Sequence, residues 1–134
     1  GFSSGEKVSL ATSESQLASA VETDIARYIT AEFGPQIAAV QTRIVQEGAS
    51  VDLYNKLGML YVRAGMYTSA VPVYQMCAKM GSVTAMNNLG NIASLQKKYT
   101  EALAWYKKAL ELEPDNKTAL KNLNRLQADL DSAE

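Results

Sequence analysis

The sequence predicts an all-α fold, a right-handed α-solenoid of antiparallel helical hairpins with about seven helices. The first observation behind this prediction is a repeated pattern, in which Leu57-Gly58 and Tyr74 recur at one constant offset as Leu89-Gly90 and Tyr106. A constant offset that relates position 57 to position 89, and position 74 to position 106, indicates an array of repeated helical units. The second observation is that apolar residues within each copy are three and four positions apart, which is the spacing of one face of an α-helix.

The two glycines of the pattern indicate where the helices of each hairpin meet. Gly58 and Gly90 fall in the middle of predicted helices, where glycine costs about 1 kcal/mol relative to alanine. We therefore expect a partner helix to approach closely at each glycine, with Ala70 and Ala102 as the small residues of that partner. A tyrosine one turn later is expected to fill the wider gap. Each copy is thus predicted to be a pair of antiparallel helices.

The pattern resembles the tetratricopeptide repeat. The second copy carries the resemblance most fully, with Leu89-Gly90, Tyr99, Ala102, Tyr106 and Pro114 at the expected places. The resemblance implies a curved stack of helical hairpins in which the first helix of each pair lines a concave surface. Members of this family usually bind an extended peptide or a partner helix on that surface.

The length of the chain favours a single domain, which we place at 14–134. Its composition argues against nucleic-acid binding, a metal site and catalysis. The 134 residues carry 13 Lys+Arg against 14 Asp+Glu, a net charge of -1, so a nucleic-acid partner is not expected. No apolar run is long enough for a transmembrane segment. Histidine is absent and Cys77 is the single cysteine, which disfavours a disulfide, a metal site and catalysis, so we expect no cofactor and no enzyme. Cys77 is interpreted as an inert packing thiol.

The N-terminal third is predicted to hold a leader and one hairpin. Residues 1–13 have no apolar period and are interpreted as a flexible leader. Residues 15–48 have apolar residues at helical spacing on both sides of Gly34-Pro35, which predicts two helices. The offset between the two clear copies, applied once more toward the N-terminus, places Ile25 on Leu57 and Val45 on Cys77 with size conserved, so we interpret 15–48 as a degenerate first repeat. The alternative is a generic hairpin that covers the open end of the array.

The remainder is predicted to form repeats 50–81 and 82–115 and a C-terminal capping helix at 116–131. Small polar residues are expected to cap the five helices at their N-termini: Ser50, Thr68 or Ser69, Ser82, Thr100 and, for the last helix, the segment Pro114-Asp115-Asn116. Met76, Met80 and Met86 are expected to fill the joint between the two repeats.

The candidate binding residues are those on the first helix of each pair that packing does not require. These are Asp52, Asn55, Lys56, Met59, Val62, Arg63, Thr84, Asn87, Asn88, Asn91, Ser94, Leu95, Thr118, Lys121, Asn122 and Arg125. From them we select as peptide-binding residues Asn55, Met59, Arg63, Thr84, Asn87, Asn91, Lys121 and Arg125. Asparagine amides donate and accept hydrogen bonds and so suit a peptide backbone, whereas Lys121 and Arg125 suit a carboxylate. The expected ligand is an acidic or C-terminal peptide.

The family also includes members that hold acidic chaperone tails in a clamp of lysine, asparagine and arginine. Asn55 and Met59, or Asn87 and Asn91, stand where that clamp has lysine and asparagine, and Thr118 stands where it has lysine. Asn88 and Asn122 fall on the other clamp positions, but Asn122 replaces an arginine. The resemblance therefore does not extend to the clamp.

Two functions follow from the sequence. The first is a protein–protein interaction module that binds a peptide or helix of a partner in its concave groove. The alternative is a self-assembly or cell-envelope scaffold that forms homo-oligomers or docks through the N-terminal helices, because the stretch from Leu17 to Val45 is rich in apolar residues. The sequence leaves the compartment open between the cytoplasm and, if an upstream signal has been removed, the bacterial periplasm or envelope.

Overall fold

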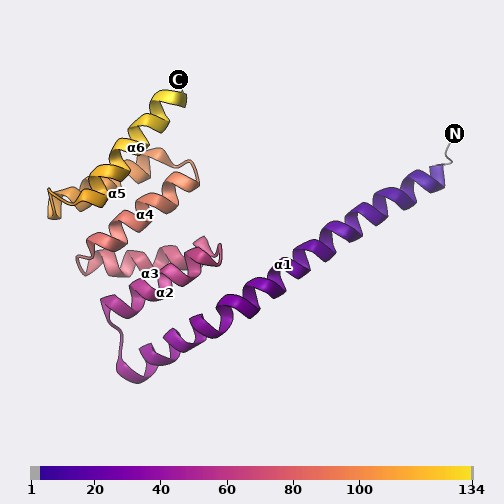
Figure 1. Cartoon of the computed structure of the whole chain (residues 1–134), viewed down its shortest axis with the longest axis horizontal. Helices are drawn as coiled ribbons and strands as arrows, with labels where there is room; N and C mark the ends of the chain where they lie inside the picture. The colour runs from indigo at the N-terminus through magenta and orange to yellow at the C-terminus, as the bar shows by residue number, and fades with distance from the viewer. Residues whose placement is uncertain (1–3, 134) are drawn as a thin grey trace. The chain divides into compact units, whose positions relative to one another are not determined.

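The computed structural model describes the backbone of residues 4–133, and side chains from residue 16 to residue 132 except residue 18. The described residues form six α-helices and no strand, in agreement with the predicted all-α solenoid (Figure 1). Their bounds are α1 (Ser4–Glu47), α2 (Val51–Arg63), α3 (Tyr67–Lys79), α4 (Val83–Leu95), α5 (Tyr99–Leu112) and α6 (Lys117–Ala133). The chain divides into two units, residues 1–38 and 39–134.

The predicted hairpin at 15–48 is wrong, since these residues belong to the single helix α1. Pro35 lies inside this helix and removes one backbone hydrogen bond. The carbonyl that loses its partner, that of Ala31, belongs to an exposed residue, where water can replace the bond. Of the predicted leader 1–13, residues 1–3 lie outside the described part, while Ser4 onward is helical. The helix count is therefore six in the described residues, one fewer than expected.

The N-terminal residues that the constant offset aligned with the first clear copy have different surroundings. Val45 is 85% exposed, whereas Cys77, on which it was placed, is fully buried. Ile25 is likewise exposed and Leu57 is buried. Within residues 16–38, the exposed large apolar side chains are Leu17, Val21, Ile25 and Tyr28. The helical spacing at the N-terminus thus reflects one long amphipathic helix and not a repeat.

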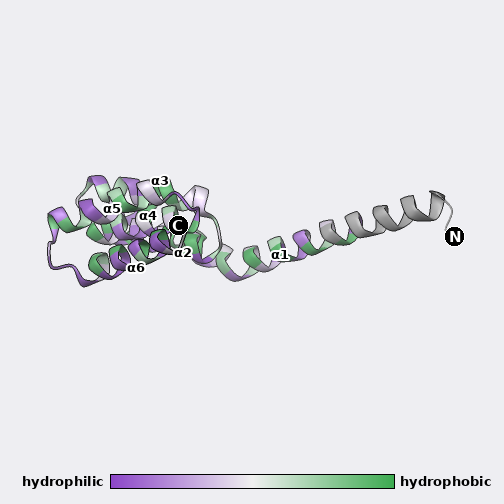
Figure 2. Cartoon of the chain, turned by 90° about the horizontal axis from the view of Figure 1, so that it is seen from above, coloured by the Kyte–Doolittle hydropathy of each residue, from purple (hydrophilic) through white to green (hydrophobic). Residues whose placement is uncertain are grey.

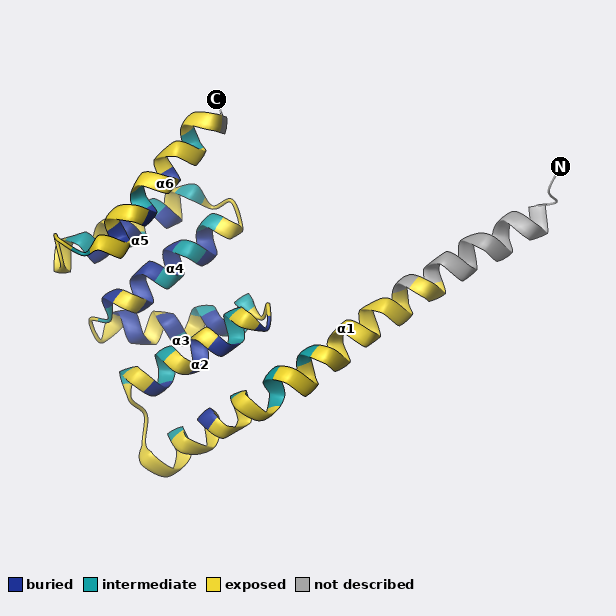
Figure 3. Ribbon diagram, viewed as in Figure 1, coloured by how far each residue is buried: buried dark blue, intermediate teal, exposed yellow. Residues whose placement is uncertain are grey.

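Residues 39–134 contain the two predicted repeats and the capping helix. Helices α2 and α3 form the first hairpin, α4 and α5 form the second, and α6 packs on α5 with a smaller contact to α4. Figure 2 shows that these helices carry hydrophobic and hydrophilic residues on different faces. The hydrophobic sides meet in the interior. Helix α4, which contacts α3, α5 and α6, is the most deeply buried of these helices (Figure 3).

Three of the five predicted N-caps are confirmed. The side chains of Ser50, Ser82 and Asn116 accept hydrogen bonds from backbone amides three residues later, at 3.1, 3.1 and 2.8 Å. The caps expected for the second helix of each repeat are wrong. Helix α3 begins after Met66 and α5 after Lys98, neither of which makes a side-chain capping bond.

The two turns within the repeats replace those caps with the same backbone motif. Each begins with a residue at positive φ, Gly65 (75°) in the first repeat and Lys97 (60°) in the second. The amide of the next residue then bonds back over five positions, from Met66 to Tyr61 at 2.7 Å and from Lys98 to Ala93 at 2.8 Å. This ends the first helix and leads directly into the second, so no polar side chain is needed.

The predicted close approach at the glycines is confirmed, with a different partner side chain. A Cβ placed on Gly58 would lie 2.6 Å from two ring carbons of Tyr74, and one on Gly90 would collide with the ring of Tyr106. The tyrosine rings therefore occupy the space that the glycines leave open. Ala70 is fully buried, as the pattern predicted for a small residue, but it is not among the atoms nearest Gly58.

The methionine prediction is confirmed only for Met86. This side chain is 1% exposed and lies in the core cluster that also contains Tyr74, Cys77 and Leu89. Met76 and Met80 are about half exposed, at 48% and 52%. The joint between the repeats is thus filled from α4, while Met76 of α3 and Met80, which follows α3, remain half exposed.

Candidate functional site

A groove of about 480 Å³ lies between α2 and α4, the first helices of the two repeats. Helix α2 contributes Asn55, Lys56, Met59, Val62 and Arg63, and α4 contributes Thr84, Asn88, Asn91, Ile92 and Leu95. Tyr74 of α3 also lines it. Its volume lies within the range of about 300–1,000 Å³ that is usual for ligand sites. We call it the α2–α4 groove.

Five of the eight selected residues line this groove: Asn55, Met59, Arg63, Thr84 and Asn91. The other three do not. Asn87 is 4% exposed and points into the packing between elements, while Lys121 and Arg125 are exposed on α6. Arg125 donates a hydrogen bond from Nη2 to the Oδ1 atom of Asn122 at 3.1 Å. The two basic residues of α6 therefore do not form one end of the groove.

Two of the asparagines link a repeat to the helix that follows it. Nδ2 of Asn55 donates to Oγ of Ser82 at 3.2 Å, and Nδ2 of Asn87 donates to Oδ1 of Asn116 at 3.3 Å. Ser82 and Asn116 are the N-caps of α4 and α6. Each asparagine thus binds the cap of the helix that follows its repeat, which is a packing role. We call these two bonds the cap links.

A third asparagine, Asn91, is held from below the groove. Its Oδ1 atom accepts a hydrogen bond of 2.6 Å from the hydroxyl of Tyr106. The amides that were expected to hold a peptide backbone are therefore partly committed to the protein itself. Nδ2 of Asn91 is the amide group that this bond leaves available at the groove.

Tyr74 lies beneath the groove beside Cys77. Burial raises the pKa of Tyr74 to about 12, with a smaller contribution in the same direction from Cys77, while a hydrogen bond with Asn88 acts to lower it. Burial also raises the pKa of the Cys77 thiol, whose Sγ donates to the carbonyl of Val51 at 3.8 Å. Both groups are thus held in their neutral forms, which supports the interpretation of Cys77 as a packing residue.

Raising the pH is expected to destabilise the fold through these two groups. The usual pKa values are 10.0 for tyrosine and 9.0 for cysteine, and the folded values are higher, about 12 for Tyr74. The unfolded chain therefore loses these protons first. Their contribution to the free energy of unfolding is complete below about pH 9 and is lost progressively as the pH rises through the folded values. Urea unfolding in reducing buffer across this range measures the effect.

The Tyr74→Phe variant is the control for the alkaline effect. It keeps the ring and removes the ionisable hydroxyl, so its free energy of unfolding should fall less steeply between about pH 10 and pH 12. An unchanged slope would show that Tyr74 does not contribute.

Six groove residues lie outside the narrower selection: Lys56, Val62, Tyr74, Asn88, Ile92 and Leu95. Four of these were in the wider set on the first helices. Tyr74 was expected to fill a packing gap and Ile92 was not singled out, and both are buried in the core. They reach the groove because its floor is the outer surface of that core. The constant offset of the repeats would have identified Leu95, since it aligns with the selected Arg63.

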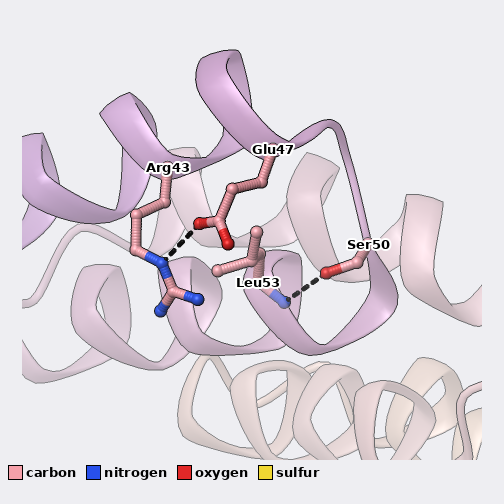
Figure 4. A network of polar contacts seen from close by, with 4 residues as sticks. All are labelled: Arg43, Glu47, Ser50 and Leu53. Carbon is pink, nitrogen blue, oxygen red and sulfur yellow. Dashed lines mark hydrogen bonds and ion pairs between the residues drawn. The ribbon is translucent and has the colours of Figure 1, made fainter.

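A second, polar hollow of about 410 Å³ lies where the end of α1 meets the start of α2. Three of its polar side chains already have partners, as Figure 4 shows, whereas Asp52 and Lys56 also line it. Nε of Arg43 donates to Oε2 of Glu47 at 2.7 Å, and Oγ of Ser50 accepts from the amide of Leu53. The hydrogen bond to Arg43 lowers the pKa of the Glu47 carboxyl. This hollow is therefore a weaker candidate than the α2–α4 groove.

Comparison with known proteins identifies the repeats. Family models described as tetratricopeptide repeat match residues 51–80 and 83–116, which are the α2–α3 and α4–α5 hairpins. The chain belongs to the tetratricopeptide repeat family. The helix pairs and the glycine–tyrosine contacts are thus those of two tetratricopeptide repeats, and α6 follows them as a single helix.

Two curated proteins are similar in sequence. The chain is 32% identical over 97 residues to the uncharacterized protein ycf37 of Cyanophora paradoxa, a match that covers 68% of the chain and 56% of ycf37. It is 36% identical over 69 residues to the chloroplastic tetratricopeptide repeat domain-containing protein PYG7 of Arabidopsis thaliana, covering 50% of the chain and 23% of PYG7. The chain therefore spans little more than half the length of the first relative and less of the second.

A solved tetratricopeptide repeat structure has the same fold. The first repeat domain of Spaghetti (RPAP3), bound to the HSP90 peptide SRMEEVD, aligns with a TM-score of 0.65 and 19% identity. The alignment covers 86% of this chain and 94% of that domain.

The part of the chain that the structure describes contains neither a candidate membrane span nor a candidate metal site. Among the described residues, no helix is both long enough and apolar enough to cross a membrane. In that part, too, Cys, Asp and Glu side chains form no group of three or more that could hold a metal ion. The expectations of no cofactor, no enzymatic activity and no nucleic-acid partner remain predictions.

Proposed function

We propose that this chain is a non-enzymatic interaction module that binds a polypeptide segment of a partner protein in the α2–α4 groove. The observation that carries the proposal is the groove itself, which lies on the first helices of two consecutive tetratricopeptide repeats and gathers exposed side chains from both helices. Leu95 is 64% exposed and Met59 is 38% exposed within it. Such apolar side chains at a concave surface favour a protein partner.

The structural comparison supports the same function. A domain of this fold binds an HSP90 peptide in Spaghetti (RPAP3). At 19% identity the likeness concerns the fold, so the ligand of that domain is not transferred to this chain. The chloroplastic relative PYG7 suggests a plastid or a related compartment as the first place to look for a partner.

The test is to select peptides from a phage-displayed random library on the full chain and to map their binding by NMR. The chain has five methionines, at 59, 66, 76, 80 and 86, and their methyl groups can be labelled together. We expect peptides of micromolar affinity that shift the methyl signal of Met59, which lines the groove.

The other methionines serve as internal controls. Met66, Met76 and Met80 are exposed and do not line the groove, so their signals should not move. Peptides that shift Met76 or Met80 but not Met59 would place binding on α3 and contradict the proposal, as would failure to select any binder.

Self-assembly through the N-terminal helix remains a second prediction. Four large apolar side chains in residues 16–38 are exposed, namely Leu17, Val21, Ile25 and Tyr28, and they fall within one arc of α1 at 100° per residue. This arc is consistent with an oligomer contact, but no observation on it identifies the surface that would cover it.

A further inference from the structure

We infer that the α2–α4 groove recognises a bulky apolar side chain flanked by carboxylates, within a segment of a partner protein. This inference rests on the proposed function and specifies the chemistry of its ligand. It differs from the ligand expected from the sequence, which was held by amides and by the basic residues of α6. The groove has another composition, because the relevant amides are partly committed and the α6 residues lie elsewhere.

The apolar part of the groove can hold an anchoring side chain. Met59 and Val62 on α2 face Ile92 and Leu95 on α4 across it. Methionine adapts its shape to different apolar partners. Burying one aliphatic or aromatic side chain here removes apolar surface of both partners from water, which favours binding by about 10- to 100-fold.

The charged part of the groove determines what surrounds the anchor. Lys56 and Arg63 line it, and neither forms an ion pair with any described residue. Among the described residues, no carboxylate lines the groove. The site is therefore positive although the whole chain has a net charge of -1. Carboxylates beside the anchor would complement it, whereas lysine or arginine there would be repelled.

The repeat offset places apolar and polar groups opposite one another. Met59 of α2 corresponds to Asn91 of α4, and Arg63 corresponds to Leu95, at the same offset that relates the two glycines. At these two levels of the groove one helix thus presents an apolar side chain and the other a polar one, whereas Lys56 and Asn88, related by the same offset, are both polar. A ligand that satisfies both levels must itself carry apolar and polar side chains close together, which describes the inferred segment.

The peptides selected on the full chain provide the probes. They are synthesised with acetylated N-termini and amidated C-termini, which removes the terminal charges. We expect the selected sequences to be rich in Leu, Ile, Phe or Met with Asp or Glu nearby. Replacing the apolar anchor by alanine should weaken binding about 10- to 100-fold. Replacing the neighbouring carboxylates by amides should weaken it by up to about fivefold and reduce its dependence on salt.

Matched protein variants test the groove from the other side. Leu95→Ser should weaken binding about tenfold, whereas Leu112→Ser changes an exposed leucine of α5 outside the groove and should have no effect. The double variant Lys56→Gln/Arg63→Gln should reduce the salt dependence, and Lys79→Gln, an exposed lysine of α3, should not. Circular dichroism verifies that each variant is folded.

The outcomes separate this inference from the proposed function. Peptides that shift Met59 but retain their affinity without an apolar anchor, or that prefer basic neighbours, would overturn the inference and leave the function intact. A requirement for a free C-terminal carboxylate would also overturn it. If no peptide shifts Met59, the function fails and the inference fails with it.

Discussion

Tyr106→Ala is expected to lower the free energy of unfolding by about 3–5 kcal/mol. Tyr106 is 1% exposed, and its ring fills the space beside Gly90. A cavity left by the ring cannot be closed from the opposite helix, because Gly90 has no side chain to move into it. Since domains of this size have a total stability of about 5–15 kcal/mol, urea unfolding followed by circular dichroism should show a large shift of the midpoint.

Two controls isolate the contribution of the ring. Tyr106→Phe keeps the ring and removes only the hydrogen bond to Asn91, so it should cost about 0.5–1.5 kcal/mol. Gly90→Ala should destabilise the wild-type chain by about 1–3 kcal/mol, because the new Cβ collides with the ring. In the Tyr106→Ala background the same change should stabilise by up to about 1 kcal/mol, since alanine favours the helix. The same sign in both backgrounds would refute the contact.

Met86→Ala is expected to cost about 2–5 kcal/mol, the second of the two largest effects. Met86 is 1% exposed and lies in the core cluster where α3 and α4 meet. Met76→Ala is the matched control, because Met76 also lies within a helix but is 48% exposed. Its effect should stay within about 0.5 kcal/mol. Equal losses in thermal or urea unfolding would mean that the exposed methionine also supports the joint.

The repeats could be predicted from the sequence because their pattern comes from packing. Gly58 and Gly90 have to be small, Tyr74 and Tyr106 have to be large, and these requirements recur at a constant offset. Because the pattern occurs twice, each of its positions is identified by two residues instead of one. The assignment of α2 to α5 followed from this pattern to within a few residues.

The N-terminal helix could not be predicted in the same way. Gly34-Pro35 is typical of a helix end, yet α1 continues through it. A Cβ on Gly34 would meet only Thr30 Cγ2 at ordinary van der Waals distance, so this glycine does not mark a close approach. The similar sizes of Ile25 and Leu57 also led to the wrong prediction of a repeat at 15–48, because a match in size does not establish burial.

The site was predicted in outline but not in composition. The first helices of the repeats were correctly identified as the walls of the groove, yet Asn87 was selected and Leu95 was not. A sequence does not show which polar side chains are committed within the protein, and Asn87 is bound to Asn116. Helical spacing alone does not distinguish an asparagine that is available to a ligand from one that is bonded within the protein.

The cap links have a consequence for how this surface can change. Asn55 lines the groove, and its Nδ2 atom donates to Oγ of Ser82. A substitution at Ser82, which starts α4, would therefore alter the wall on α2 although the two residues lie 27 positions apart. The residue that starts a helix in the second repeat thus also holds a side chain of the groove wall in the first, so we expect one substitution at Ser82 to change both.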